Sequence, residues 1–248
     1  MTNQVIFEPH IMSAIDSELL TAVEIFNSRF SEAIGYIDYL KSIDSRETRI
    51  KVGSSPNFLE VDREFIKICR ANGYLIIYNL VESTMYEAVK GLYQHLERSG
   101  ADIDSLIDKL KMLIFRGIRN STDKNLTEFR DNMDTDFRTS IFQICFHSNQ
   151  VKKMFSGNLD AKKIRLFSEE HGINLNLIEE SNNGRELLSI KNTRNDLAHG
   201  AVSFTSKGNI SVEQLWKLCT EVGYYLRSVI MSVDAFLKAQ QYNKPTTI

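Results

Sequence analysis

The chain has 248 residues, of which 42% are hydrophobic and 25% are charged, as is usual for a globular protein rather than a disordered or fibrous one. Its formal net charge of −2 excludes a strong overall positive field, so any binding of nucleic acid must depend on a local basic patch. Only 3 prolines and 12 glycines occur, which leaves long stretches in which a helix can run uninterrupted. The composition therefore favours helix.

Cysteine spacing and hydropathy give expectations about the cellular location. Cys69, Cys145 and Cys219 lie far apart in apolar helical patterns and lack CxxC spacing, which predicts free thiols in the core. The first ten residues, MTNQVIFEPH, lack the basic and apolar regions of a signal peptide. No segment approaches the roughly 18 apolar residues that span a bilayer. We therefore expect a cytoplasmic protein without membrane association.

Hydrophobic residues at steps of three and four predict helices along the first half of the chain. The first helix is predicted over 12–41. A polar segment with glycine, serine and proline at 42–57 is predicted to be a loop. The longest helix is predicted over 59–98, and a shorter amphipathic helix over about 103–118.

The middle of the chain contains shorter elements. Residues 119–135 offer few large apolar side chains and indicate an exposed connection, or at most a solvated helix. Residues 136–147 predict a short helix. Asp160 stands at a capping position, which predicts a further short helix that ends at Gly172.

The last third is predicted to hold two helices joined by a loop. One runs from about 184 to His199, where Gly200 ends it. The final helix covers 211–240 and opens with Ser211 and Gln214 at capping-box spacing.

Together these elements predict an all-α helical bundle with long core helices and a long C-terminal helix. No strand alternation persists along the sequence. We expect one domain over 1–248, in which 1–57 forms an N-terminal helix and loop and 58–240 forms the core. Polar surface excursions are expected near 119–135 and 147–183.

The segment KNTRNDLAHG at 191–200 is the hardest to explain by packing alone. Arg194, Asn195, Asp196 and His199 place four polar or ionisable groups at the end of a helix. Residues five apart differ by about 140° in azimuth on an ideal helix, so Arg194 and His199 do not share a face of it. They converge only if the helix ends or distorts there, or if a second chain completes the site.

The residue types of this segment suit phosphodiester chemistry. Arginine presents a planar fork of donors that matches phosphate oxygens, and histidine exchanges protons near neutral pH. In RNA the 2′-hydroxyl is an internal nucleophile beside the phosphorus, so the protein must only move protons and stabilise charge. Such chemistry needs no metal, and the sequence shows no metal-ligand spacing and implies no cofactor.

The same segment resembles the motif of HEPN domains, here in an Arg-x4-His form with a polar residue directly after the arginine. The helix ANGYLIIYNLVESTMYEAVKGLYQHL at 71–96 is similar to the aromatic-rich core helix of HEPN proteins. The SGNLDAKKI run and the LAHG-AVSF continuation resemble one bacterial HEPN subgroup. The similarity spans about 60–240.

The resemblance implies a metal-independent endoribonuclease, often a toxin or an antiviral effector, that leaves a 2′,3′-cyclic phosphate and a 5′-hydroxyl. Arg194 would bind or polarise the scissile phosphate, and His199 would act as general base or acid. Asn195 would hydrogen-bond the phosphate or orient the histidine. The implied substrate is RNA, for example tRNA or mRNA, and the implied protein partner is an antitoxin or a defence complex.

The resemblance also implies a homodimer with two facing motifs. The residues favour it separately, because transphosphorylation is best served by two proton-transfer groups and each chain supplies one histidine here; a two-fold axis would bring a second His199 to the same cleft. Some HEPN proteins carry a tyrosine two residues after the histidine, which a nucleotidyltransferase modifies. Ala201 stands at that position, so regulation by this route is not expected.

Several other residues have both a functional and a structural interpretation. Asp196 is a secondary catalytic candidate, although pairing with an arginine or facing solvent is the commoner role. Glu82 is either a buried partner of Arg194 or a surface residue. A set of basic residues either contacts the RNA backbone or forms a solvated face: Lys152, Lys153, Lys162, Lys163, Arg165 and, within the motif, Lys191. The remaining histidines and three core-helix tyrosines are predicted to be structural: His10, His95, His147, His171, Tyr74, Tyr78 and Tyr93.

A second function, from a different class, is a non-catalytic HEPN module that serves as a dimerisation or binding subunit of a defence or toxin–antitoxin complex. The acidic pI of about 6.2 favours this alternative, because a nuclease must gather a polyanion. The complete Arg-Asn-His set favours the enzyme.

Overall fold

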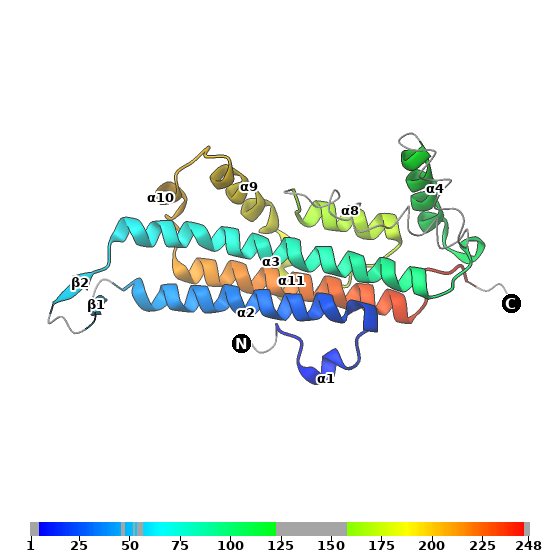
Figure 1. The fold of residues 1–248 in the computed structure, drawn as a ribbon, viewed down its shortest axis with the longest axis horizontal. Coiled ribbons are helices and arrows are strands. Elements are labelled where there is room, and N and C mark those ends of the chain that lie inside the picture. Colours follow the sequence, from blue (N-terminus) through cyan, green and yellow to red (C-terminus); the bar gives the residue numbers. More distant parts are fainter. Residues whose placement is uncertain (1–4, 46–47, 52, 54–56, 123–157, 246–248) are drawn as a thin grey trace.

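The computed structural model describes residues 5–45, 48–51, 53, 57–122 and 158–245. In these ranges the chain is almost entirely helical (Figure 1). The elements, in chain order, are α1 (Pro9–Met12), η2 (Ser17–Leu19), α2 (Leu20–Ile43), β1 (Arg49–Lys51), β2 (Phe58–Glu60), α3 (Arg63–Arg98), η3 (Ile103–Ser105), α4 (Asp108–Thr122), α8 (Ala161–His171), η5 (Glu179–Gly184), α9 (Leu187–Ala198), α10 (Phe204–Lys207) and α11 (Val212–Lys238).

The three longest helices, α2, α3 and α11, pack against one another and form the frame of the molecule (Figure 1). Apolar residues from all three are fully buried between them, including Phe26, Phe30, Ile77, Leu226 and Phe236. Because the helices are long and share one core, we call α2, α3 and α11 the three-helix frame.

A layer of shorter helices, α8, α9 and α10, covers α3 on the side away from α2 (Figure 1). The approach of α10 to α3 is close: a Cβ atom at Gly208 would lie 2.0 Å from the carbonyl oxygen of Lys67, so only glycine fits there. This layer carries the RNDLAHG segment, and we call it the site layer.

Most helices lie where the sequence predicted them, but the helix predicted over 12–41 begins only at Leu20 and the helix predicted over 59–98 begins at Arg63. The final helix has the predicted capping box, in which Ser211 and Gln214 bond each other's backbone N–H groups. Asp160 caps α8, and Gly172 ends it with φ at 75°. The helix predicted to begin near residue 184 begins instead at Leu187, because residues 179–184 form the separate turn η5.

The loop predicted over 42–57 ends in a small antiparallel hairpin that the sequence did not reveal. Strands β1 and β2 pair Arg49 with Glu60, Ile50 with Leu59 and Lys51 with Phe58, and all six residues are exposed. Strands of three residues are too short for an alternating pattern to be recognised.

Some expectations fall partly or wholly outside the described residues. The connection predicted over 119–135 is helical as far as Thr122, where α4 ends, and 123–135 and 136–147 are not described. Cys145 is not described either, whereas Cys69 and Cys219 are free thiols, half-buried and buried respectively. Across the ranges given above, no helix is both long and apolar enough to cross a membrane.

Candidate active site

Helix α9 carries the site because one of its sides is apolar and the other polar. Leu187, Ile190 and Leu197 are buried and hold the helix against the rest of the protein. Asn192 and His199 are exposed, and Arg194 lies between the two sides, half-buried. The spacing of the apolar residues therefore decides which groups of the motif reach solvent.

The end of α9 is a Schellman motif. Gly200 adopts φ +68°, its N–H donates to the carbonyl oxygen of Leu197 at 3.3 Å, and the N–H of Ala201 donates to that of Asp196 at 2.9 Å. Glycine favours this left-handed conformation because it has no Cβ. His199 is consequently the last residue before a sharp turn, and its side chain is exposed.

Arg194 is held by two neighbours. Its Nη1 donates to Oδ1 of Asn195 at 3.0 Å. Its guanidinium carbon lies 5.1 Å from the centroid of the Tyr78 ring, within the range of a cation–π contact. Asn195 therefore contacts the arginine, whereas the sequence suggested the phosphate or the histidine as its partner.

Tyr78 comes from α3 and is buried beneath Arg194. Its hydroxyl oxygen accepts the N–H of Leu159 at 2.9 Å and its hydroxyl group hydrogen-bonds Glu82. Burial is the main reason that the pKa of Tyr78 rises to about 12. The sequence allowed Glu82 to be a buried partner of Arg194 or a surface residue; it is half-buried and bonds the tyrosine under Arg194.

Lys191 and Asp160 form an ion pair one turn before Arg194. Their Nζ and Oδ2 atoms are 2.6 Å apart, and their side chains are only 16% and 13% exposed. Burial opposes the ionisation of Asp160, but Lys191 and the N–H of Lys163 outweigh it, so its pKa is lowered. This pair fixes the start of α8 to α9.

The other basic candidates do not gather around Arg194 through any contact in the described ranges. Lys162 and Arg165 are exposed on α8, and Lys163 is half-buried there. Arg165 donates to the carbonyl oxygen of Asn183 at 3.2 Å. Lys152 and Lys153 lie outside the described residues.

Asp196 faces α10. Its Oδ2 lies 3.1 Å from Nζ of Lys207, which makes it part of an ion pair between two elements of the site layer. The partner is a lysine, where the sequence suggested an arginine or solvent.

No hydrogen bond links Arg194 to His199 in the part of the chain that the structure describes, and the His199 ring has no partner there. The helix does end at His199, which was one of the two ways in which Arg194 and His199 could come together at one site. The other way is that a second chain completes the site.

Comparison with known families adds to this geometry. A family model described as MAE_28990-like HEPN matches residues 19–242, which is most of the chain and includes the whole motif. The chain belongs to the HEPN family. No curated protein and no solved structure gave a significant match to it. The fold of this HEPN chain is all-α and HEPN-like, as the sequence predicted.

Two of the remaining histidines of the HEPN chain, His171 and His95, have structural surroundings. His171 is fully buried, with Nδ1 bonded to the carbonyl oxygen of Phe167 and Nε2 accepting from the Tyr93 hydroxyl, each at 2.8 Å. Nδ1 of His95 lies 2.9 Å from Asp16, and His10 is exposed. His147 lies outside the described residues. Among the residues that are described, no group of three or more His, Cys, Asp or Glu is arranged to hold a metal ion.

Proposed function

We propose that this HEPN protein is a metal-independent endoribonuclease that cleaves RNA by attack of a 2′-hydroxyl on the adjacent phosphorus. The observation that supports it most is the way in which the side chain of Arg194 is held in place. Its guanidinium is held by Asn195 and Tyr78 at the end of the helix on which His199 is exposed. Such a pair supplies a fixed cation for a phosphate and a group that exchanges protons.

Arg194 is suited to stabilise charge on the phosphate. A guanidinium has five N–H donors, and Asn195 occupies one of them. The Arg194 side chain is only half-buried, so the N–H donors that Asn195 does not occupy can reach phosphate oxygens. Stabilisation of charge that develops in the transition state is usually the largest single contribution to catalysis.

His199 is the proton-transfer group of the proposal. As general base it would take the proton of the 2′-hydroxyl, and as general acid it would protonate the leaving 5′-oxygen. One histidine does not perform both transfers at once from one position. A homodimer with a composite site would bring the second His199 by two-fold symmetry.

The exposed side of α9 is open to such a partner. Leu188, at 52% exposure, lies on this side together with Asn192 and His199. These residues are spaced four and seven apart and so follow one face of the helix. A second copy docked along this face would place two motifs opposite each other.

The substrate would be RNA, with tRNA and mRNA as the first candidates, and an antitoxin or a defence complex would control the enzyme. The alternative, a non-catalytic binding subunit, is favoured by the net charge of −2, which gives no general attraction for a polyanion. In support of the ribonuclease, the exposed side chains of Lys162 and Arg165 on α8 supply local positive charge for RNA.

The decisive experiment is cleavage of total RNA and of tRNA in EDTA by wild-type protein and by Arg194→Ala and His199→Ala. We expect discrete fragments from wild type, and a rate loss of roughly 100-fold or more in each variant. Arg185→Ala is the matched control, because it removes an exposed arginine that lies just before α9 and outside the motif. Intact RNA from folded, dimeric wild type whose expression is harmless to cells would favour the binding subunit.

The oligomeric state is tested by sedimentation of the same samples. A composite site predicts a dimer at the concentrations at which cleavage is measured. Full activity of a monomer would contradict the two-histidine arrangement while leaving the ribonuclease itself intact.

A further inference from the structure

Three segments that are far apart in the sequence meet beneath Arg194. Tyr78 comes from the middle of α3, Leu159 directly precedes α8, and Arg194 lies in the last turns of α9. Tyr78 contacts both of the others, through its ring and through its hydroxyl group. Tyr78 therefore joins the three segments.

The Tyr78 ring is fixed in orientation. The side chain is only 2% exposed, and its hydroxyl group both accepts from the N–H of Leu159 and bonds Glu82. A ring bonded on both sides of its hydroxyl cannot swing without losing buried hydrogen bonds. The face that it presents to Arg194 is accordingly constant.

An arginine side chain is long and loses much rotamer freedom when it is held in one place. At Arg194, Nη1 donates to Oδ1 of Asn195, and the guanidinium carbon lies 5.1 Å from the centroid of the Tyr78 ring. These two contacts restrict the orientation of the guanidinium. The donors that remain then point in set directions before any substrate arrives, which is the requirement for preorganised charge stabilisation.

We propose that Tyr78 is a positioning residue of the ribonuclease site, whose ring holds the Arg194 guanidinium in the orientation that binds the scissile phosphate. The proposal rests on the proposed function and names a residue outside the motif as part of its machinery. The hydroxyl group has a separate task, since it holds the backbone of Leu159 in place.

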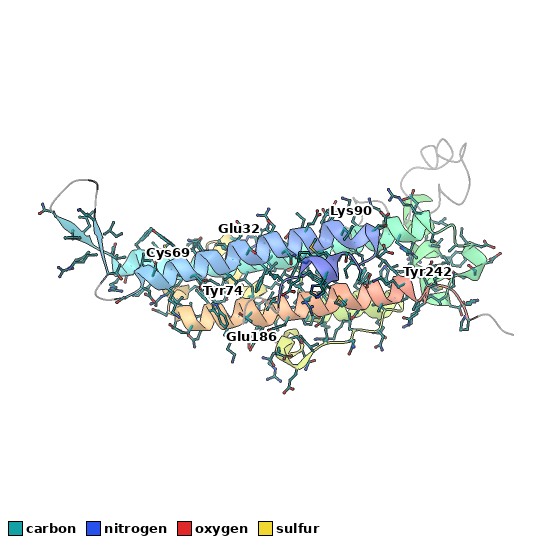
Figure 2. The ribbon with its side chains drawn as sticks, turned by 90° about the horizontal axis from the view of Figure 1, so that it is seen from below. Glu32, Cys69, Tyr74, Lys90, Glu186 and Tyr242 are labelled. Carbon is teal, nitrogen blue, oxygen red and sulfur yellow. The ribbon has the colours of Figure 1, made fainter. Side chains whose placement is uncertain are left out.

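Two substitutions separate the ring from the hydroxyl group. Tyr78→Phe keeps the aromatic face and removes the bonds to Leu159 and Glu82, whereas Tyr78→Leu removes the face as well. The matched control is Tyr242→Leu. Tyr242 is also buried, but it packs against His95 and Phe236. Figure 2 shows it at the opposite end of the bundle from Tyr74, which lies one helical turn before Tyr78.

The first readout is the nuclear magnetic resonance signal of the Arg194 side-chain Nε–H, assigned by its loss in Arg194→Ala. A guanidinium that lies over an aromatic ring is shifted by the ring current. We expect the shifted signal in wild type, Tyr78→Phe and Tyr242→Leu, and a signal near the free-arginine position in Tyr78→Leu. An unchanged Arg194 signal in Tyr78→Leu would overturn the proposal.

The second readout is RNA cleavage with kcat and KM measured separately. Tyr78→Leu should lower kcat by about tenfold or more, because a misplaced arginine no longer meets the transition state. Tyr78→Phe should retain most of the activity, because it keeps the ring that holds Arg194. If the role of Tyr78 were only structural, losing its buried hydrogen bonds would be expected to matter as well. Equal losses of kcat in Tyr78→Leu and Tyr242→Leu, at equal thermal stability, would also overturn the proposal. If wild type cleaves no RNA, the proposed function fails, and the Arg194 signal alone decides whether Tyr78 holds the arginine.

Discussion

The three-helix frame is held together by apolar packing, whereas the site layer combines apolar packing with polar contacts between its elements. In the frame, aromatic and aliphatic side chains are fully buried, as in the stacked pair Phe26 and Phe30, whose ring centroids are 5.8 Å apart. In the site layer, Leu187 and Ile190 are buried as well, and single polar contacts are added to this packing: Lys191 with Asp160, Asp196 with Lys207, and Leu159 with Tyr78. Stability therefore depends mainly on the frame, while the geometry of the site depends on a few bonds that can be broken one at a time.

The largest effect is expected from a cavity in the frame. Phe30→Ala removes a ring that is 1% exposed and should lower the free energy of unfolding by about 3–5 kcal/mol. Chemical denaturation followed by circular dichroism measures it. Phe65→Ala, at a side chain that is 53% exposed, is the control and should change stability by less than about 0.5 kcal/mol. Similar losses in both variants would show that the frame is not the source of stability.

A smaller effect is expected from breaking the ion pair of the site layer. Lys191→Met leaves the largely buried carboxylate of Asp160 without its partner and should cost about 2 kcal/mol, with a larger fractional loss of RNA cleavage than of stability. Adding Asp160→Asn, which keeps the helix cap but removes the charge, should restore part of the stability.

The control for that pair is Lys217→Met, since Lys217 is 74% exposed and its ion pair with Glu221 spans 3.7 Å. It should leave both stability and cleavage almost unchanged, because exposed pairs contribute little. If Lys191→Met behaved in the same way, the polar contacts would not be what positions the site layer.

The contact between α8 and α3 adds a dependence on pH. Burial lowers the pKa of His171 from 6.5 to about 4, so the unfolded chain binds its proton first as the pH falls. Stability should be complete above about pH 6.5 and decrease between pH 6.5 and 4, by at most about 1.4 kcal/mol per pH unit from this group. Urea denaturation at several pH values measures it, and His171→Gln should show a shallower slope. Equal pH dependence of stability in wild type and His171→Gln would show that His171 is not its source.

The smallest effect is expected at the turn that ends α9. Gly200 has φ +68° and open space around its missing Cβ, so Gly200→Ala meets only backbone strain, of about 1 kcal/mol. Thermal unfolding measures the cost. Gly35→Ala lies within α2, also has open space and has no strained φ, so it should be neutral or stabilising.

Much of the fold follows from local sequence, because a helix repeats its apolar positions every three or four residues. The capping box at Ser211 and the ends of α8 at Asp160 and Gly172 are local too, and they were predicted correctly. The hairpin at 49–60 was not, since its strands are too short to show a period.

The candidate site was predictable only in part. Arg194, Asn195 and His199 stand together in one segment, so composition singled them out. Tyr78 was taken as a core residue, and it is one, but its contact with Arg194 joins two helices that nothing in the spacing relates. Lys191 was counted among the basic residues available to RNA, whereas its charge is paired with Asp160, which lies 31 residues earlier in the sequence.

The most direct test of the central claim is the chemistry of the cleaved ends. An RNA oligonucleotide cut by wild-type protein is analysed by mass spectrometry, together with the same oligonucleotide carrying a 2′-deoxy sugar at the mapped cleavage position. The account predicts a 2′,3′-cyclic phosphate and a 5′-hydroxyl, and no cleavage at the 2′-deoxy position. Cleavage of the 2′-deoxy strand, or fragments with 5′-phosphate and 3′-hydroxyl ends, would contradict it.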